Sequence, residues 1–97
     1  TDDKALPAAE RKRLQVVHAP TLSRRGKVLK LADKVANLRS LAEDPPLDWD
    51  LERARAYVAW STSVADGLTG VSAALEAAFA QAAQDALGAI AALERAS

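Results

Sequence analysis

The fold is decided by the stretch SRRGKVLKLADKVANLRSLAE, residues 23–43. At about 100° per residue, its apolar residues fall on one side of a helix. These residues are Val28, Leu31, Ala32, Val35, Leu38 and Ala42. Ser23 is a candidate N-cap, and the Asp44-Pro45-Pro46 turn ends the helix after about Glu43. The stretch therefore predicts an amphipathic helix that buries one side.

The opposite side of this helix, or its border, carries Lys30, Asp33, Lys34 and Asn37. Asp33 and Asn37 are four residues apart, so they are neighbours on a helix surface, and Lys30 lies one turn earlier. An acid, an amide and an ammonium in one row suit a site for a metal and a polar ligand. The same spacing occurs on ordinary solvated helix faces, and it marks such a face more often than it marks a binding site. Arg39 falls inside the apolar band, so we expect a structural ion pair with a carboxylate elsewhere.

Two further helices are expected, one before and one after the helix of residues 23–43. The first begins at Pro7, since a missing N–H costs nothing at the first helical position, and it stops before Pro20. Its apolar positions are Leu14 and Val17. The third helix follows Asp50 as its cap and ends near Gly67 and Gly70. Its apolar stripe is Tyr57, Trp60, Val64 and Leu68.

A fourth helix follows Ser72, and its apolar residues recur at helical spacing. They are Leu75, Phe79, Ala82, Ala86, Ile90 and Leu93. No segment has the alternation of a strand. The fold class predicted is all-α with four helices, and the short connections favour antiparallel neighbours.

Composition excludes several classes of protein. The 97 residues contain no Cys, which excludes a disulfide framework, a thiol nucleophile and a Cys-based zinc site. They also contain no Met, so we expect a fragment, a processed chain or a missing beginning. No apolar run reaches the roughly 20 residues of a membrane span, and no secretory signal opens the chain. A cytoplasmic location is the default expectation, with no membrane partner.

Charge is unevenly distributed along the chain. Residues 1–49 hold ten Lys and Arg against seven Asp and Glu, whereas residues 50–97 hold three against six. A basic first half suits an anionic ligand, although ordinary solvated helix faces explain it about as well. A nucleic-acid partner is not expected, because no reading helix is recognisable and the second half is acidic.

Several uncommon strings occur in one order along the chain. They are Thr1-Asp2-Asp3-Lys4, Leu6-Pro7, Glu10-Arg11-Lys12-Arg13-Leu14-Gln15, His18-Ala19-Pro20, Lys30-Leu31-Ala32-Asp33-Lys34, Asn37-Leu38-Arg39, Trp49, Glu52-Arg53, Tyr57, Trp60 and Asp66-Gly67-Leu68. With these strings the chain resembles, over about residues 1–76, the small alarmone hydrolases, which are similar to the hydrolase domain of the RelA/SpoT proteins and to the metazoan SpoT homologue.

The resemblance implies that residues 1–97 are the C-terminal portion of a single HD-type hydrolase domain. That family removes pyrophosphate from the 3′ position of ppGpp or pppGpp with one Mn²⁺, held by two histidines and two aspartates. The last aspartate lies in the Lys-Leu-Ala-Asp-Lys motif and corresponds to Asp33. By the same resemblance Asn37, Arg53 and Tyr57 would contact the guanosine alarmone, with Trp49 nearby. Lys30 completes the substrate-binding set.

The chain lacks the family's early His, its His-Asp pair and its Glu-Asp pair, so no catalytic residue is expected in this half. Its one histidine, His18, precedes Ala19 rather than an aspartate and is expected to be structural or exposed. We therefore expect Mn²⁺ only together with an N-terminal half, which would be a partner unless the chain associates as a dimer. Ala8 stands where the family usually has a lysine, which puts one pyrophosphate contact in doubt. The alternative is a helical interaction module without catalysis, and a His and a His-Asp pair upstream would exclude it.

Overall fold

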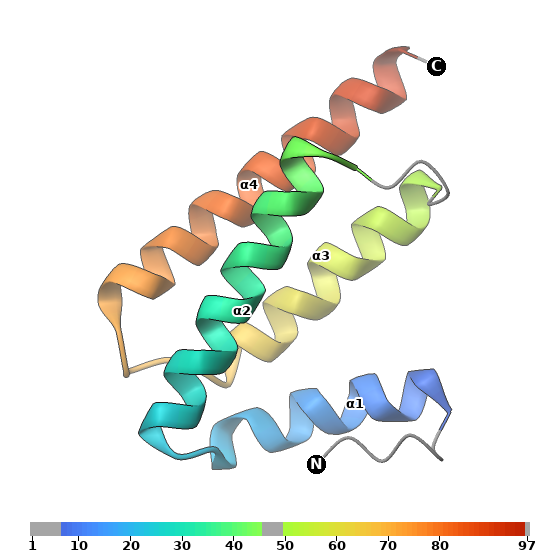
Figure 1. Cartoon of the computed structure of the whole chain (residues 1–97). Coiled ribbons are helices and arrows are strands. Elements are labelled where there is room, and N and C mark those ends of the chain that lie inside the picture. Colours follow the sequence, from blue (N-terminus) through green and yellow to red (C-terminus); the bar gives the residue numbers. More distant parts are fainter. Residues whose placement is uncertain (1–6, 46–49, 97) are drawn as a thin grey trace.

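The structure is a computed structural model of the chain, and it describes residues 7–45 and 50–96. It contains four α-helices, α1 (Ala8–His18), α2 (Arg24–Glu43), α3 (Leu51–Asp66) and α4 (Ala73–Ala96), with a 3-10 turn η1 (Ala19–Thr21) after α1 (Figure 1). No strand occurs in the described ranges, so the predicted all-α fold of four helices is confirmed. The expectations for Thr1–Lys4, Leu6, Pro46 and Trp49 lie outside the described residues.

The helices form a shallow layer. α2 packs most extensively against α4, α3 also packs on α4, and α1 lies across one end and contacts α3 (Figure 1). The principal-axis extents are 42 × 35 × 16 Å, so the molecule is much thinner in one dimension than in the other two. Within residues 7–45 and 50–96, none of the helices combines the length and the apolar character that a bilayer crossing requires.

Three of the helices begin at side-chain caps, and the sequence predicts two of these caps, Ser23 and Asp50. The Ser23 hydroxyl accepts a hydrogen bond of 3.0 Å from the Gly26 N–H, and the Asp50 carboxylate accepts one of 2.6 Å from the Arg53 N–H. Ser72 accepts one of 3.1 Å from the N–H of Leu75. Each cap satisfies an N–H that the helix leaves without an internal partner, and contributes about 1 kcal/mol. Pro7 occupies the N-cap of α1 rather than its first helical position.

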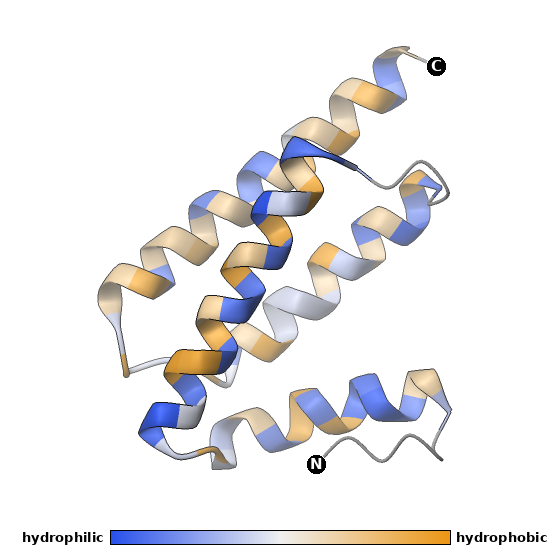
Figure 2. Ribbon diagram, viewed as in Figure 1, coloured by the Kyte–Doolittle hydropathy of each residue, from blue (hydrophilic) through white to orange (hydrophobic). Residues whose placement is uncertain are grey.

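The core lies where α2, α3 and α4 meet. Along α2 the hydropathy alternates between apolar and hydrophilic residues, whereas α4 is mildly apolar over most of its length (Figure 2). The core consists of Ala19, Leu31, Val35, Leu38, Leu41, Ala54, Val58, Val64, Leu68, Phe79, Ala82, Ala86 and Ile90. Alanines let α4 approach its neighbours closely, and leucines of α2 fill the space that remains.

Five expectations about burial are wrong. Ala32, expected on the apolar side of α2, is exposed. Val17 is half exposed, and its neighbour Val16 packs against the core instead, because α1 crosses one end of the layer and buries none of its residues fully. Leu93 is exposed since the last turns of α4 extend beyond α2 (Figure 1). Arg39 is exposed and needs no structural ion pair. Lys34, expected on the polar side or its border, is buried.

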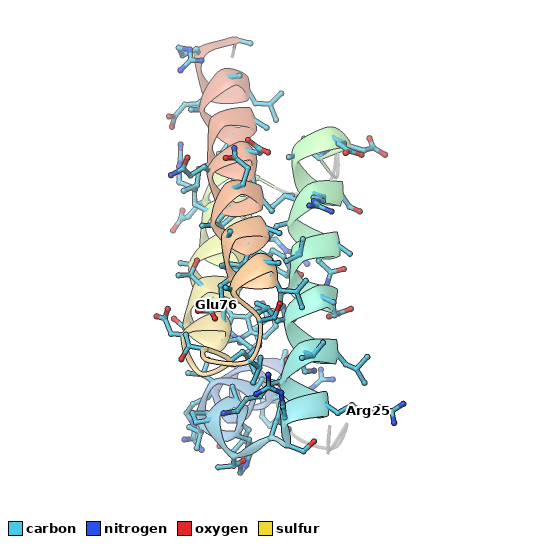
Figure 3. All side chains as sticks on the ribbon, turned by 90° about the vertical axis from the view of Figure 1, so that its left-hand side faces the viewer. Arg25 and Glu76 are labelled. Atoms are coloured by element: carbon cyan, nitrogen blue, oxygen red, sulfur yellow. The ribbon has the colours of Figure 1, made fainter. Side chains whose placement is uncertain are left out.

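The connection from α3 to α4 depends on two glycines. Gly67 follows α3 directly, and a Cβ there would lie 2.8 Å from the Ala19 Cβ and 2.9 Å from the Pro20 Cδ. Gly70 has a φ of 86°, in the left-handed region that glycine adopts without strain. Its N–H donates to the carboxylate of Glu76, which lies beside this connection in Figure 3, whereas the Arg25 side chain in the same view extends away from the layer.

Candidate functional site

The polar row on α2 exists as a hydrogen-bonded pair. The Asn37 side-chain amide donates a hydrogen bond of 3.3 Å to Oδ2 of Asp33, one helical turn earlier. Both residues are exposed, and the Asp33 side chain is 57% exposed. The prediction that these two residues are neighbours on the helix surface is confirmed. The exposed Asp33 carboxylate remains accessible to a ligand.

Tyr57 brings α3 to this pair. Burial raises the pKa of the Tyr57 hydroxyl above its ordinary value, and the nearby negative charge of Asp33 raises it further. The nearby polar side chains of Ser61 and Asn37 oppose this rise in the pKa without cancelling it. The phenol is therefore neutral at physiological pH, and its hydroxyl lies among Asn37, Asp33 and Ser61, where it can donate a hydrogen bond.

Lys34 lies directly beneath this polar row. Its side chain is only 6% exposed, and its ammonium is 3.9 Å from Oδ2 of Asp33. The same ammonium lies over the Trp60 ring, 4.2 Å from the ring centroid. A cation over an indole face is stabilised by about 2 kcal/mol when it is desolvated. These two contacts offset part of the cost of burying the charge.

Trp60 connects the site to α1. Its indole N–H donates a hydrogen bond of 3.1 Å to the main-chain carbonyl of Lys12, and the Lys12 ammonium lies 5.2 Å from the ring centroid. The Tyr57 ring packs against the Trp60 ring with centroids 5.6 Å apart and planes tilted by 52°. Trp60, which the sequence places in the apolar stripe of α3, is half buried, packs against the core and forms one wall of the site. The site residues predicted from sequence do not include Lys12, Lys34 or Trp60.

The other predicted site residues lie at the edge of this group. Arg53 is exposed, one turn before Tyr57 on α3, and its backbone N–H is used by the Asp50 cap. Lys30 is half buried, one turn before the Asp33 and Lys34 pair. Within the part of the chain that the structure describes, Lys30 makes no hydrogen bond or ion pair. His18, the chain's one histidine, is exposed as expected and lies at the end of α1.

The donor set fits one position in the coordination sphere of a divalent cation. A carboxylate held through one oxygen, as Asp33 is held through Oδ2, is the kind of ligand that Mn²⁺ and Mg²⁺ take. Across residues 7–45 and 50–96, however, no three or more His, Asp or Glu side chains are grouped as a metal site requires. Catalytic metal sites use about three protein ligands, so the described residues supply at most one of them.

The similar proteins found by comparison share one named activity. No protein-family model matches the chain. It is 50% identical over 76 residues to the guanosine-3′,5′-bis(diphosphate) 3′-pyrophosphohydrolase MESH1 of Danio rerio, a match that covers 78% of this chain and 42% of the relative. This chain is homologous to MESH1. The human MESH1 is 49% identical over 78 residues, which cover 80% of this chain and 44% of the relative.

A solved structure agrees with the sequence comparison. A metazoan orthologue of SpoT that hydrolyses ppGpp and plays a role in starvation responses superposes with a TM-score of 0.80 at 45% identity. The match covers 84% of this chain and 46% of that protein. The expected four-helix part of an HD-type hydrolase is thereby confirmed as the fold. The chain spans less than half the length of the MESH1 relatives that it matches.

Proposed function

We propose that the chain forms part of a metal-dependent phosphohydrolase that removes the 3′-pyrophosphate from ppGpp or pppGpp. The homology to MESH1 supports the reaction and the substrate class. The observation that carries the proposal within this chain is the meeting of Asp33 and Asn37 of α2 with Tyr57 of α3. An acid, an amide and a neutral phenol on adjoining helices suit a metal beside a nucleoside.

In this proposal each site residue has a distinct task. Asp33 is one oxygen ligand of Mn²⁺. When bound, the metal supplies an activated water and withdraws charge from the phosphoryl oxygens. Asn37 and Tyr57 hydrogen-bond the nucleoside. Arg53 and Lys30, at the edge of the group, provide positive charge for the phosphates.

The remaining metal ligands belong to a part of the protein outside this chain. The described residues form no group of three ligands, and the chain matches less than half of its relatives' length. We therefore expect these 97 residues alone to hydrolyse no ppGpp, and the partner that completes the site to be an N-terminal half or a second copy. A cytoplasmic location goes with this proposal, since the enzyme would draw on the cell's pool of guanosine nucleotides.

The test is a Mn²⁺-dependent ppGpp assay on the complete gene product with Asp33→Ala. Loss of a metal ligand should lower turnover by more than about 100-fold. The matched control is Asp85→Ala, because Asp85 on α4 accepts a hydrogen bond of 2.9 Å from Gln81 in the same four-residue spacing. Undiminished turnover in Asp33→Ala would contradict the assignment, and so would an equal loss in the control.

A second candidate, a helical interaction module, has one observation in its favour. The layer is 16 Å across its thinnest dimension, and Leu29, Leu87 and Leu93 are exposed to 61%, 45% and 45%. Apolar side chains exposed on a thin layer favour association with another surface. Sedimentation tests it, because a clean monomer at high concentration would count against association. Mn²⁺-dependent turnover by the complete gene product would exclude a module without catalysis.

A further inference from the structure

Lys34 is the one charged residue that is buried in the described part of the chain. The Lys34 side chain is 6% exposed, whereas the side chain of Asp33, its neighbour in sequence, is 57% exposed. A lysine at a helix border ordinarily extends its ammonium to water. Burying that charge is costly unless it is compensated. The contacts of the ammonium must therefore compensate for its loss of water.

The Lys34 ammonium contacts the carboxylate that the proposed function uses. It lies 3.9 Å from Oδ2 of Asp33, a distance of charge attraction rather than of a hydrogen bond. Asn37 donates to the same oxygen from one turn away. The two contacts approach Oδ2 from different residues and neither uses Oδ1. An oxygen restrained in this way limits rotation of the whole carboxylate.

The ammonium is itself restrained by Trp60. The indole face lies 4.2 Å from the Lys34 nitrogen, and the indole N–H is fixed to the main-chain carbonyl of Lys12. A continuous set of contacts thus runs from α1 through Trp60 of α3 to Lys34 and Asp33 of α2. The orientation of the acid depends on the docking of two other helices.

We propose that Lys34 is a positioning residue, held over Trp60 so that its charge fixes the Asp33 carboxylate with one oxygen turned toward a divalent cation. This inference rests on the proposed function for the identity of the cation. The fixing of Asp33 is a property of these helices and is measurable without metal.

The sign of the effect on metal affinity separates positioning from simple electrostatics. A positive charge beside a metal ligand repels the metal, so removing that charge should tighten Mn²⁺ binding if charge alone matters. If orientation dominates, the same removal weakens binding. Lys34→Met is the suitable variant, because Met has a similar length and is apolar, so the buried position accepts it.

The metal-free measurement uses the side-chain amide of Asn37, followed by NMR in the complete gene product. In Lys34→Met we expect its resonances to move toward those of an asparagine amide that makes no hydrogen bond within the protein, because its acceptor oxygen is no longer fixed. Lys12→Met is the matched control, since that lysine lies over the same Trp60 ring but belongs to α1 and does not pair with Asp33. Trp60→Phe, which keeps a ring face but loses the bond to Lys12, should shift the same resonances. Unchanged Asn37 resonances in Lys34→Met would overturn the proposal.

The second measurement is the Mn²⁺ dissociation constant of the same variants. We expect a weakening of roughly 10-fold in Lys34→Met, the size typical for residues that orient a ligand, and none in Lys12→Met. Binding that stays the same or tightens in Lys34→Met would overturn the proposal. If the wild-type protein binds Mn²⁺ without hydrolysing ppGpp, the proposed function fails while the positioning of Asp33 by Lys34 is retained.

Discussion

The indole N–H of Trp60 and the main-chain carbonyl of Lys12 are joined by a hydrogen bond of 3.1 Å between α3 and α1. α1 contributes no fully buried residue to the core, so burial alone holds it weakly. A side-chain hydrogen bond between the two helices therefore carries an unusual share of the docking of α1. The same ring supports Lys34, and for this reason the site and the position of α1 are coupled.

Trp60→Phe should lower the free energy of unfolding by about 1 kcal/mol beyond the loss of contact area, which is the net value of one such hydrogen bond. For a domain of this size, that loss corresponds to a fall in Tm of roughly 4–8 °C. Thermal denaturation followed by circular dichroism measures it. Trp60→Ala, which also removes the ring, should be clearly more destabilising, and equal Tm values for the two variants would contradict the role of the ring.

Gly67→Ala and Gly88→Ala should change stability in opposite directions. A Cβ at position 67 would meet Ala19 and Pro20 at 2.8 and 2.9 Å, distances that force η1 and the end of α3 apart. Such overpacking costs about 1–3 kcal/mol. Gly88 lies within α4 with open space around it, so alanine there should stabilise the helix by about 0.5–1 kcal/mol. Urea denaturation of the pair measures both changes, and a neutral Gly67→Ala would show that the chain relaxes at this contact.

The starts and ends of the helices were predictable from sequence because they depend on neighbouring residues. Ser23, Asp50 and Ser72 each bond an N–H three residues ahead, so the four residues involved contain the whole signal. The apolar sides were predicted less well. The exposed Val17 and Leu93 have the same local sequence pattern as buried residues. They are exposed because α1 crosses one end of the layer and because α4 extends beyond the end of α2.

The residues of the candidate site were likewise predictable only in part. Asp33 and Asn37 follow from helical spacing, whereas Tyr57 and Arg53 were found only through the resemblance to the alarmone hydrolases. Lys34 was missed because its burial depends on Trp60, which lies 26 positions later on another helix and is itself anchored to α1. Periodicity within one helix contains no information about such a three-helix contact.

Ser23→Ala should cost about 1 kcal/mol, because it removes the hydroxyl that accepts the Gly26 N–H at the start of α2. The first turn of α2 contains Arg24 and Arg25 and no acid, so no carboxylate compensates the positive end of the helix dipole. Ser40→Ala is the control within the same helix, since Ser40 is exposed and alanine is a good helix former. Chemical denaturation should show a loss for the first variant and none for the second.

Tyr57 should make the folded state sensitive to alkaline pH. Burial, chiefly, raises the pKa of its hydroxyl in the folded protein above the ordinary value of about 10. A raised pKa in the folded state means that the contribution to stability is fully present below pH 10 and is lost as the pH rises above it. Difference titration of tyrosinate absorbance between the wild type and Tyr57→Phe isolates this group, since the sequence has one tyrosine. Asp33→Asn should lower the pKa of Tyr57 by removing a nearby negative charge, although burial should still keep it above that of a free tyrosine. A titration at or below the free value in the folded wild type would show that the hydroxyl is not held among Asn37, Asp33 and Ser61.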